Sequence, residues 1–450
     1  MNPSARLQAT LELLTEIDSV LRPADALVSA YFRARRYIGS KDRAAVSTMT
    51  YDILRHRARL DWWLKKADGL PTARSWLLAY LALVNEMRLK DIGEMFSGGK
   101  YAPEKLEEFE RVILRQLETH TIEHPDMPEE VKTECPDWAA IPLKERFGKN
   151  FSKEMRALLK AAPLDLRVNP LKTTRDAILD ELKTLAIKAE ACTLSEFGIR
   201  VFERPSLNAL PMLKNGSVEI QDEGSQLVAL LVDAKPGQRV VDFCAGAGGK
   251  TLAIAAQMKN KGKIIACDVL AKRLERSTER FRRAGLHNIE VKPLKSERDP
   301  WVKKHKGDFD RVLVDAPCSG TGTWRRNPDG RWRSLGPGLE KLLPLQAEIL
   351  DSAARLVKSG GRLIYATCSM LPEENEKQVE AFLASHPDFK LVPYKAIWAE
   401  GVSAQEECLS LTPAQHGTDG FFAAVMENTA APKPPKEVRE GVEPASQETA

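Results

Sequence analysis

Apolar residues recur every three or four positions along the first 120 residues of the chain. The pattern is clearest over residues 5–21, 23–39, 42–64 and 73–87, where aliphatic and aromatic side chains would share one face of a helix. This spacing predicts amphipathic helices that bury their apolar faces against one another. Residues 1–120 are therefore expected to form an all-α domain.

The middle and the end of the chain change character. Residues 121–145 are rich in proline and acidic residues, which is typical of a linker. Between 146 and 225, extended and helical stretches alternate ("LDLRVNPLKTT", "TRDAILDELKTL", "FGIRVFE"), which predicts a small α+β subdomain. Residues 429–450 lack aromatic residues, leucine and isoleucine and are rich in proline and charge, a composition typical of a disordered tail.

Residues 226–428 alternate between short apolar runs and segments of helical period. The runs at 239–243, 262–268, 309–317 and 361–369 have the length of buried strands, and helical patterns separate them. Such alternation predicts a parallel sheet with crossover helices on both faces. The expected fold class is α/β, a doubly wound and mainly parallel sheet, preceded by the all-α domain and the α+β subdomain.

Composition narrows the class of protein. The chain has 450 residues, of which 43% are hydrophobic and 29% charged, which allows two or three folded domains. A net charge of +4 permits an anionic partner without requiring one. No apolar run approaches the roughly 20 residues that cross a bilayer, and the acidic residues near the N-terminus argue against a targeting signal. We expect a cytoplasmic, monomeric protein.

Neither the cysteines nor the histidines suggest a metal centre. The seven cysteines are widely spread and form no C-x-x-C pair, which favours free thiols. His120 and His124 are one helical turn apart, as zinc ligands often are, but no third ligand accompanies them. No metal site is expected.

A glycine-rich stretch, "CAGAGGKT" at 244–251, follows the apolar run "RVVDF". It departs from a triphosphate loop at Cys244 and from a dinucleotide loop at Thr251, where each pattern requires glycine. What remains is a strand, a glycine turn and a helix N-terminus, which present backbone N–H groups to a polar ligand. Asp268 ends the next strand about 20 residues later, where a carboxylate can accept from two ribose hydroxyls. Together these features predict a nucleoside-bearing cofactor.

Two cysteines follow later strands of the same predicted sheet. Cys318 lies in "DAPCSG", together with Asp315, and Cys368 lies in "ATCS". Because the carboxyl ends of parallel strands share one edge of a sheet, both thiols should lie beside the glycine loop. This arrangement suggests covalent catalysis, in which one thiol attacks and the other completes the cycle. The chemistry alone does not decide which thiol attacks.

Four motifs resemble the Sun/RsmB family, the RNA cytosine-C5 methyltransferases that use S-adenosylmethionine: "DFCAGAGGKT", "DAPCSGTGTWRRNPDGRW", "LQAEILDSAARLVKSGGRLIYATCSMLPEENE" and "GTDGFF". The resemblance runs from about residue 160 to 426, and the region before 120 is similar, less closely, to a NusB-like RNA-binding domain. It implies a class I (Rossmann-like) methyltransferase domain acting on RNA, with small-subunit (16S) rRNA as the expected substrate. A tRNA methyltransferase and a catalytically idle rRNA assembly factor are the alternatives.

The resemblance also implies roles for single residues. It makes Cys368 the nucleophile, Cys318 the residue that helps to release the product, Asp268 the ribose ligand and Asp315 a contact to both cofactor and base. The cofactor loop would consist of Cys244, Ala245, Gly246, Ala247, Gly248, Gly249 and Lys250. Plausible RNA contacts are Arg167, Lys172, Arg325 and Arg326.

Two positions depart from the family pattern. The loop usually reads "AAPGGK", and here Ala247 stands where proline would stiffen the turn. Lys295 stands where the family usually has an aspartate that contacts the adenine. Either Glu297 or Asp299 supplies that contact, or it is absent.

The expected chemistry begins with a thiolate that attacks C6 of cytosine and makes C5 nucleophilic enough to take a methyl group. A free thiol, with a pKa of about 8.5, is mostly protonated at neutral pH, so we expect Lys250 and the basic stretch "WRRNPDGRW" to favour its ionisation. Asp315 would hydrogen-bond the N3/N4 edge of the base. Because the base must be unstacked, we expect a single-stranded or loop target held by "TWRRNPDGRW".

Overall fold

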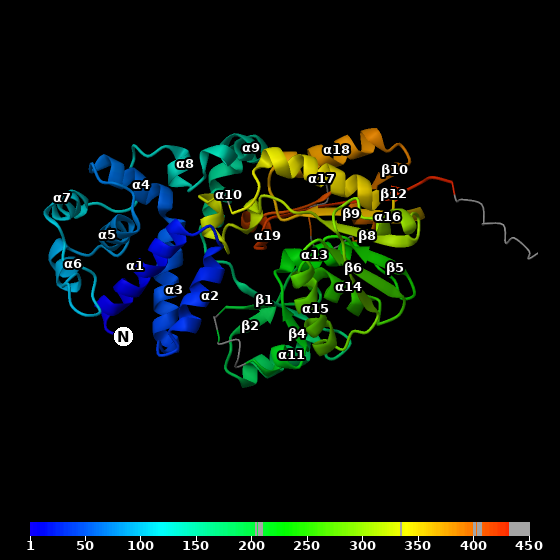
Figure 1. Ribbon diagram of the computed structural model, residues 1–450, viewed down its shortest axis with the longest axis horizontal. Helices are drawn as coiled ribbons and strands as arrows, with labels where there is room; N and C mark the ends of the chain where they lie inside the picture. The colour runs from blue at the N-terminus through cyan, green and yellow to red at the C-terminus, as the bar shows by residue number, and fades with distance from the viewer. Residues whose placement is uncertain (203–204, 206–209, 334, 399–401, 403–406, 432–450) are drawn as a thin grey trace, which may run out of the picture.

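The computed structural model describes residues 1–202, 205, 210–333, 335–398, 402 and 407–431. The last residue of the predicted strand at 197–203, and the predicted tail from residue 432 on, lie outside these residues. The N-terminal region is all-α, as predicted, and forms one end of the molecule (Figure 1, blue to cyan). Its helices are α1 (Pro3–Ser19), α2 (Ala24–Ala34), α3 (Ser40–Arg55), α4 (Arg57–Lys66), α5 (Ala73–Leu83), α6 (Leu89–Met95) and α7 (Glu108–Leu117).

Helix α5 is the centre of this bundle. Every residue from Trp76 to Leu83 is buried, and a helix that is buried on all sides lies in a core rather than on a surface. The helix begins with a reciprocal capping box, in which Ser75 N donates to Thr72 Oγ1 and Thr72 N donates to Ser75 Oγ. Packing and capping together account for a helix of apolar composition in this position.

The stretch 121–145, predicted as a linker, is folded. It contains α8 (Glu129–Lys132) and most of α9 (Asp137–Phe147), and α10 (Phe151–Ala157) follows. Glu134 is fully buried in this stretch and accepts hydrogen bonds from Ala58 N at 2.7 Å and Arg59 Nε at 2.9 Å. A buried carboxylate with such partners fixes the segment against the helical bundle, because unpairing it would leave a charge in the interior.

A small α+β unit follows, at the bottom centre of Figure 1. Its elements are β1 (Leu164–Val168), α11 (Arg175–Thr184), β2 (Ala189–Ala191), β3 (Gly198–Val201), α12 (Pro211–Lys214) and β4 (Val218–Ile220). The strands form an antiparallel sheet in the order β2-β3-β1-β4. Arg167 of β1 stands directly opposite Glu219 of β4 in this sheet.

The larger sheet confirms the predicted doubly wound fold. Its strands are β5 (Arg239–Asp242), β6 (Lys263–Asp268), β7 (Ile289–Pro293), β8 (Phe309–Asp315), β9 (Val357–Thr367), β10 (Phe389–Val392), β11 (Leu409–Leu411) and β12 (Phe421–Asn428). The order is β10-β12-β9-β8-β5-β6-β7, with β11 paired to β12. Strands β5 to β9 are parallel, and β12 is inserted antiparallel between β9 and β10.

Helices cover both faces of this sheet because successive strand residues point to opposite sides. Val240 packs in the core formed with α13 (Glu223–Leu231), α14 (Gly249–Gln257) and α15 (Ala271–Arg283). Val241 packs in the core formed with α16 (Pro300–Lys304), α17 (Leu339–Ala354) and α18 (Glu376–Ser385). In Figure 1, α13 to α15 lie on one side of the strands and α17 and α18 on the other. A short helix, α19 (Pro413–His416), precedes β12.

The strand order determines where a ligand can bind. From β5 the chain builds β6 and β7 on one side and then returns to add β8 on the other, so the direction of winding reverses between β5 and β8. A crevice opens at such a point, beyond the carboxyl ends of the strands. The segments that leave these ends carry the glycine loop, Asp268, Asp315 and Cys368. Among the described residues, no helix combines the length and apolarity that a membrane span needs.

Candidate active site

Cys318 and Cys368 face each other beyond the ends of the neighbouring strands β8 and β9. Their Sγ atoms are 3.5 Å apart, although 50 positions separate them in the sequence. Gly322 N donates to the carbonyl oxygen of Cys368 at 2.9 Å and joins the two loops. A side chain at Gly322 would collide with the carbonyl of Gly420, so the segment before β12 approaches the Cys318 loop closely only with glycine there. The backbone therefore holds the two thiols in contact.

A buried carboxylate holds the loop that carries Cys318. Glu374 accepts hydrogen bonds from Ser319 N at 2.8 Å and from Gln346 Nε2 at 2.9 Å. The same Gln346 amide donates to the carbonyl of Pro317 at 2.9 Å. The peptide units on both sides of Cys318 are thus held in place. Glu374 and Gln346 lie within the family motifs of the sequence, but nothing in the sequence indicated that they hold the Cys318 loop.

Two cysteines of this region have a raised pKa. The hydrogen bond with Cys368, followed by burial, raises the pKa of Cys318 well above its ordinary value. Cys318 is therefore a neutral thiol at neutral pH, and its Sγ lies within hydrogen-bond distance of Cys368 Sγ. Burial likewise raises the pKa of Cys244 well above its ordinary value. A buried neutral thiol is inert, which suits a structural position in the glycine loop.

Lys250 brings a positive charge to the thiols from the first turn of α14. Its Nζ lies 2.7 Å from Asp315 Oδ2 and 5.4 Å from the centre of the Phe421 ring. Burial alone would lower the pKa of Lys250, but Asp315 and a negatively charged Cys368 outweigh it, and the net shift is upward. The ammonium therefore stays charged beside both groups.

The glycine loop turns tightly between β5 and α14. Gly246 and Gly248 have φ angles of +56° and +76°, in the left-handed region that favours glycine. A Cβ at Gly248 would lie 2.6 Å from the Phe281 ring of α15, whereas a Cβ at Gly246 would meet nothing within 4 Å. The loop therefore packs directly on α15 and borders open space at Gly246. Asp268 accepts from Gly246 N at 2.8 Å, which joins the loop to the end of β6.

Asp242, the last residue of β5, is a site residue that the sequence reasoning missed. It is 1% exposed, and its Oδ2 accepts from Thr251 Oγ1 at 2.7 Å, while its Oδ1 is buried without a hydrogen-bond partner. Burial raises its pKa to about 7, and the charges of Asp315 and Asp268 add to this rise. The only signal in the sequence was an acid at the end of an apolar run.

The pKa of Asp242 predicts a pH-dependent stability. Because its folded-state pKa of about 7 lies well above that of an unfolded aspartate, the stability that the protonated carboxyl contributes is fully present below about pH 4 and is lost as pH rises through 7. The Asp242→Asn variant has no carboxyl to titrate at this position. Between pH 5.5 and 8 the melting temperature of the unaltered protein should therefore fall by several degrees more than that of the variant. Thermal melts of the protein without added ligand measure this difference.

The matched control is Asp180→Asn, which changes an exposed carboxylate on α11. It should reproduce the pH dependence of the unaltered protein. A pH dependence that is identical in all three proteins would contradict a raised pKa for Asp242.

Comparison with known proteins identifies the family. A family described as 16S rRNA methyltransferase RsmB/F matches residues 229–427, and a ferredoxin-like domain of RsmF/B-like methyltransferases matches residues 135–207. The ribosomal RNA small subunit methyltransferase B of Yersinia pseudotuberculosis is 30% identical, over 91% of this chain and 96% of its own. The chain belongs to the RsmB/F family of methyltransferases.

Two further similarities agree with this assignment. A probable ribosomal RNA small subunit methyltransferase B from Synechocystis is 37% identical over 65% of this chain and 66% of its own. The crystal structure of PH0851 superposes with a TM-score of 0.77 at 28% identity and covers 95% of this chain and 99% of its own. The RsmB/F assignment therefore rests on the sequence and on the whole fold.

Within this RsmB/F chain, Arg325 and Arg326 have partners inside the protein. Both arginines form ion pairs with the same two acids, Asp222 and Asp419. The distance to Asp222 is 3.1 Å from Arg325 and 2.7 Å from Arg326. Trp324 is 1% exposed. Trp324 and Arg325 are therefore not presented to an RNA base, and we do not propose Arg325 as an RNA contact. Burial against acids that lie about 100 positions away in the sequence explains the difference. The Arg326 side chain is 29% exposed, and its predicted RNA contact stays a prediction.

The rest of that stretch joins the catalytic sheet to the helical bundle. Asp329 accepts from Ala24 N at 2.9 Å, at the start of α2. Trp332 Nε1 donates to the carbonyl of Leu54 at 3.3 Å, and Arg333 donates to that of Arg22 at 2.9 Å. The segment that begins at Cys318 thus continues into a contact between domains.

The other two predicted RNA contacts are also engaged within the protein. Arg167 is 6% exposed and donates to the carbonyl of Gly249 at 2.8 Å. Lys172 Nζ donates to the carbonyls of Asn215 and Arg283, at 2.5 and 2.6 Å. Arg167 is not proposed as an RNA contact, because burial removes it from any external phosphate. Lys172 is exposed and stays a prediction.

The region of the expected adenine contact has an engaged aspartate. Asp299 accepts from Lys295 N and from Trp301 N, each at 2.9 Å, and so caps α16. Lys295 is exposed, and Glu297 lies within 4 Å of Arg298. The choice among these residues for the adenine stays a prediction.

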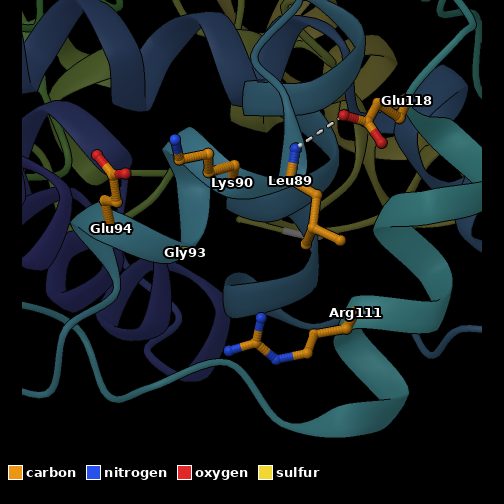
Figure 2. A pocket seen from close by; sticks show the side chains of 6 residues that line it. All are labelled: Leu89, Lys90, Gly93, Glu94, Arg111 and Glu118. Atoms are coloured by element: carbon orange, nitrogen blue, oxygen red, sulfur yellow. Dashed lines mark hydrogen bonds between the residues drawn. The ribbon is translucent and has the colours of Figure 1, made fainter.

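A pocket of about 530 Å³ lies elsewhere, in the helical bundle between α6 and α7 (Figure 2). Its lining carries charges of both signs, Lys90 and Arg111 against Glu94 and Glu118. His120 and His124 lie near the same end of the bundle, and their rings contact Trp63 with centroids 4.8 and 5.2 Å away. No group that could hold a metal occurs among the described residues. Neither feature contributes to the cysteine site.

Proposed function

We propose that this chain transfers a methyl group from S-adenosylmethionine to C5 of a cytosine in small-subunit rRNA, through a covalent cysteine intermediate. The observation that carries the proposal is the contact between Cys318 and Cys368, with Lys250 and Asp315 beside it. A nucleophile in contact with a second proton-transferring thiol suits addition to and elimination from a pyrimidine ring. Relatives named as small-subunit rRNA methyltransferases support the choice of substrate.

The residues at the crevice fit S-adenosylmethionine. Open space borders the loop at Gly246, and the carboxylates of Asp268 and Asp315 lie close enough to Asp242 to raise its pKa. Asp242 also has a buried carboxylate oxygen without a partner. Acidic groups around the loop attract a molecule that carries an ammonium and a sulfonium. When bound, this cofactor supplies an electrophilic methyl group. Asp268 would hold its ribose, and the loop its methionine end.

Cys368 acts first in the proposed mechanism. Its thiolate attacks C6 of the unstacked cytosine, forming the S–C6 bond and moving the C5–C6 electron pair onto C5. Asp315 hydrogen-bonds the N3/N4 edge of the ring, and the Lys250 ammonium balances the negative charge on thiolate and carboxylate. The electron pair at C5 can then form the new bond to the methyl carbon, as the bond from that carbon to the sulfonium sulfur breaks and its electron pair stays on sulfur.

Cys318 completes the cycle. Its high pKa makes its thiolate the stronger base of the pair, which suits removal of the C5 proton once its own proton has passed to water. As the C5–H bond breaks, the C5–C6 double bond re-forms and the S–C6 bond to Cys368 breaks. The C5 proton restores the Cys318 thiol, and one proton is released to water in each turnover.

Bisulfite sequencing of RNA from cells that lack this gene tests the proposal. We expect one or a few cytosines of small-subunit rRNA to lose their resistance to conversion, and the gene supplied in trans to restore it. The same change confined to tRNA would favour a tRNA methyltransferase. Unchanged conversion in every RNA would favour an assembly factor without methyltransferase activity and would overturn the proposal.

A further inference from the structure

The carbonyl groups of the glycine loop point toward two arginines. Arg280 Nη1, on α15, donates to the carbonyl of Ala247 at 2.6 Å. Arg167 Nη1, on β1, donates to the carbonyl of Gly249 at 2.8 Å. Hydrogen bonds from a charged donor are stronger than bonds between neutral groups, so these two define the orientation of their peptide planes.

The orientation of a carbonyl determines where the next amide points. In a trans peptide the C=O and the following N–H point in opposite directions. With the Gly249 carbonyl turned to Arg167, the N–H of Lys250 in the first turn of α14 points away from the small α+β unit. Amides of a first helical turn have no partner within the helix and are available to a ligand.

Both arginines are held by strand β4 of the small α+β unit. Glu219 is 5% exposed and accepts from Arg280 Nη2 at 2.9 Å and from Arg283 Nη2 at 2.5 Å. Gln221 accepts from Arg167, which itself stands opposite Glu219 in the sheet. The unit is therefore connected to the loop through two charge-assisted hydrogen bonds, an exposed one at Ala247 and a half-buried one at Gly249.

We infer that Arg280 and Arg167, set by Glu219 and Gln221, are positioning residues for the methyl-donor cofactor. The small α+β unit thus acts on cofactor affinity by fixing the shape of the glycine loop. Ala247 is exposed and the loop contains three glycines, so its backbone has little intrinsic rigidity. The arginine bonds supply the order that the loop sequence lacks. This inference rests on the proposed function, which places S-adenosylmethionine at the loop.

The test compares Arg280→Met with Arg282→Met, which changes an exposed arginine on the same helix. Isothermal titration measures the dissociation constant of S-adenosylmethionine for the full-length variants, and circular dichroism checks their folding. We expect Arg280→Met to weaken binding about tenfold and to raise KM for the cofactor by a similar factor, with kcat at saturating cofactor changed less than about twofold. Arg282→Met should bind as the unaltered protein does.

Two milder variants keep the test decisive if Arg280→Met folds poorly. Arg280→Lys keeps a positive charge beside Glu219 but loses the planar guanidinium that donates two hydrogen bonds at once. Glu219→Gln removes the negative charge that pairs with Arg280. Each variant should weaken cofactor binding about threefold. Equal affinity in the folded Arg280 and Glu219 variants and in the unaltered protein would overturn this inference alone. Absence of binding to the unaltered protein would overturn the proposed function.

Discussion

A Cys368→Ala variant is expected to methylate no RNA, a loss of at least about 10⁴-fold in rate. In the proposed mechanism the Cys368 thiolate forms the bond to C6. Without that bond, C5 of cytosine is a poor nucleophile. Gly322 N donates its hydrogen bond to the backbone carbonyl of Cys368, so an alanine side chain at position 368 leaves this hydrogen bond intact. Transfer of radiolabelled methyl groups to small-subunit rRNA from a deletion strain measures the loss.

Cys192→Ala is the matched control for this variant, because it removes a buried thiol from the small α+β unit. It should retain methylation within about twofold. Cys368→Ala should still bind the cofactor, since the glycine loop and Asp268 are unaltered. Residual methylation above about a tenth of the unaltered rate would exclude Cys368 as the nucleophile.

Much of the catalytic fold was predictable because local pattern and global topology agree there. The runs around β5, β6, β8 and β9 have strand length and are separated by helical periods, and parallel strands with crossover helices have few arrangements. The same rule brings side chains at the ends of β8 and β9 to one edge. That is why Asp315, Cys318 and Cys368 could be expected beside the glycine loop from sequence alone.

The roles of the charged residues were not predictable in this way. An arginine looks the same in the sequence whether it binds a phosphate or an acceptor inside the protein. Arg325 binds Asp222, about 100 positions away, and Arg167 binds the carbonyl of Gly249, about 80 positions away. Sequence spacing contains no information on such pairs. Burial decides, because an arginine removed from water must find an acceptor within the protein. The raised pKa of Asp242 has the same origin in burial, to which the charges of Asp315 and Asp268 add once the chain is folded.

Cys318→Ala should give the opposite outcome to Cys368→Ala: a trapped covalent complex between protein and RNA. In the proposed mechanism Cys318 removes the C5 proton, and without that step the S–C6 bond to Cys368 cannot break by elimination. Turnover should fall at least about 100-fold, while most of the protein becomes linked to RNA in the presence of S-adenosylmethionine. A band of lower mobility on a denaturing gel, sensitive to ribonuclease, reports the adduct.

The double variant Cys318→Ala/Cys368→Ala is the control that shows whether the adduct depends on these two thiols. It should form no adduct, because the bond to C6 requires Cys368. The proposed order of the two thiols explains why one substitution stalls the reaction before the covalent step and the other after it: Cys368 forms the bond to C6, and Cys318, in contact with it, removes the C5 proton. An adduct with Cys368→Ala and none with Cys318→Ala would exchange the two roles.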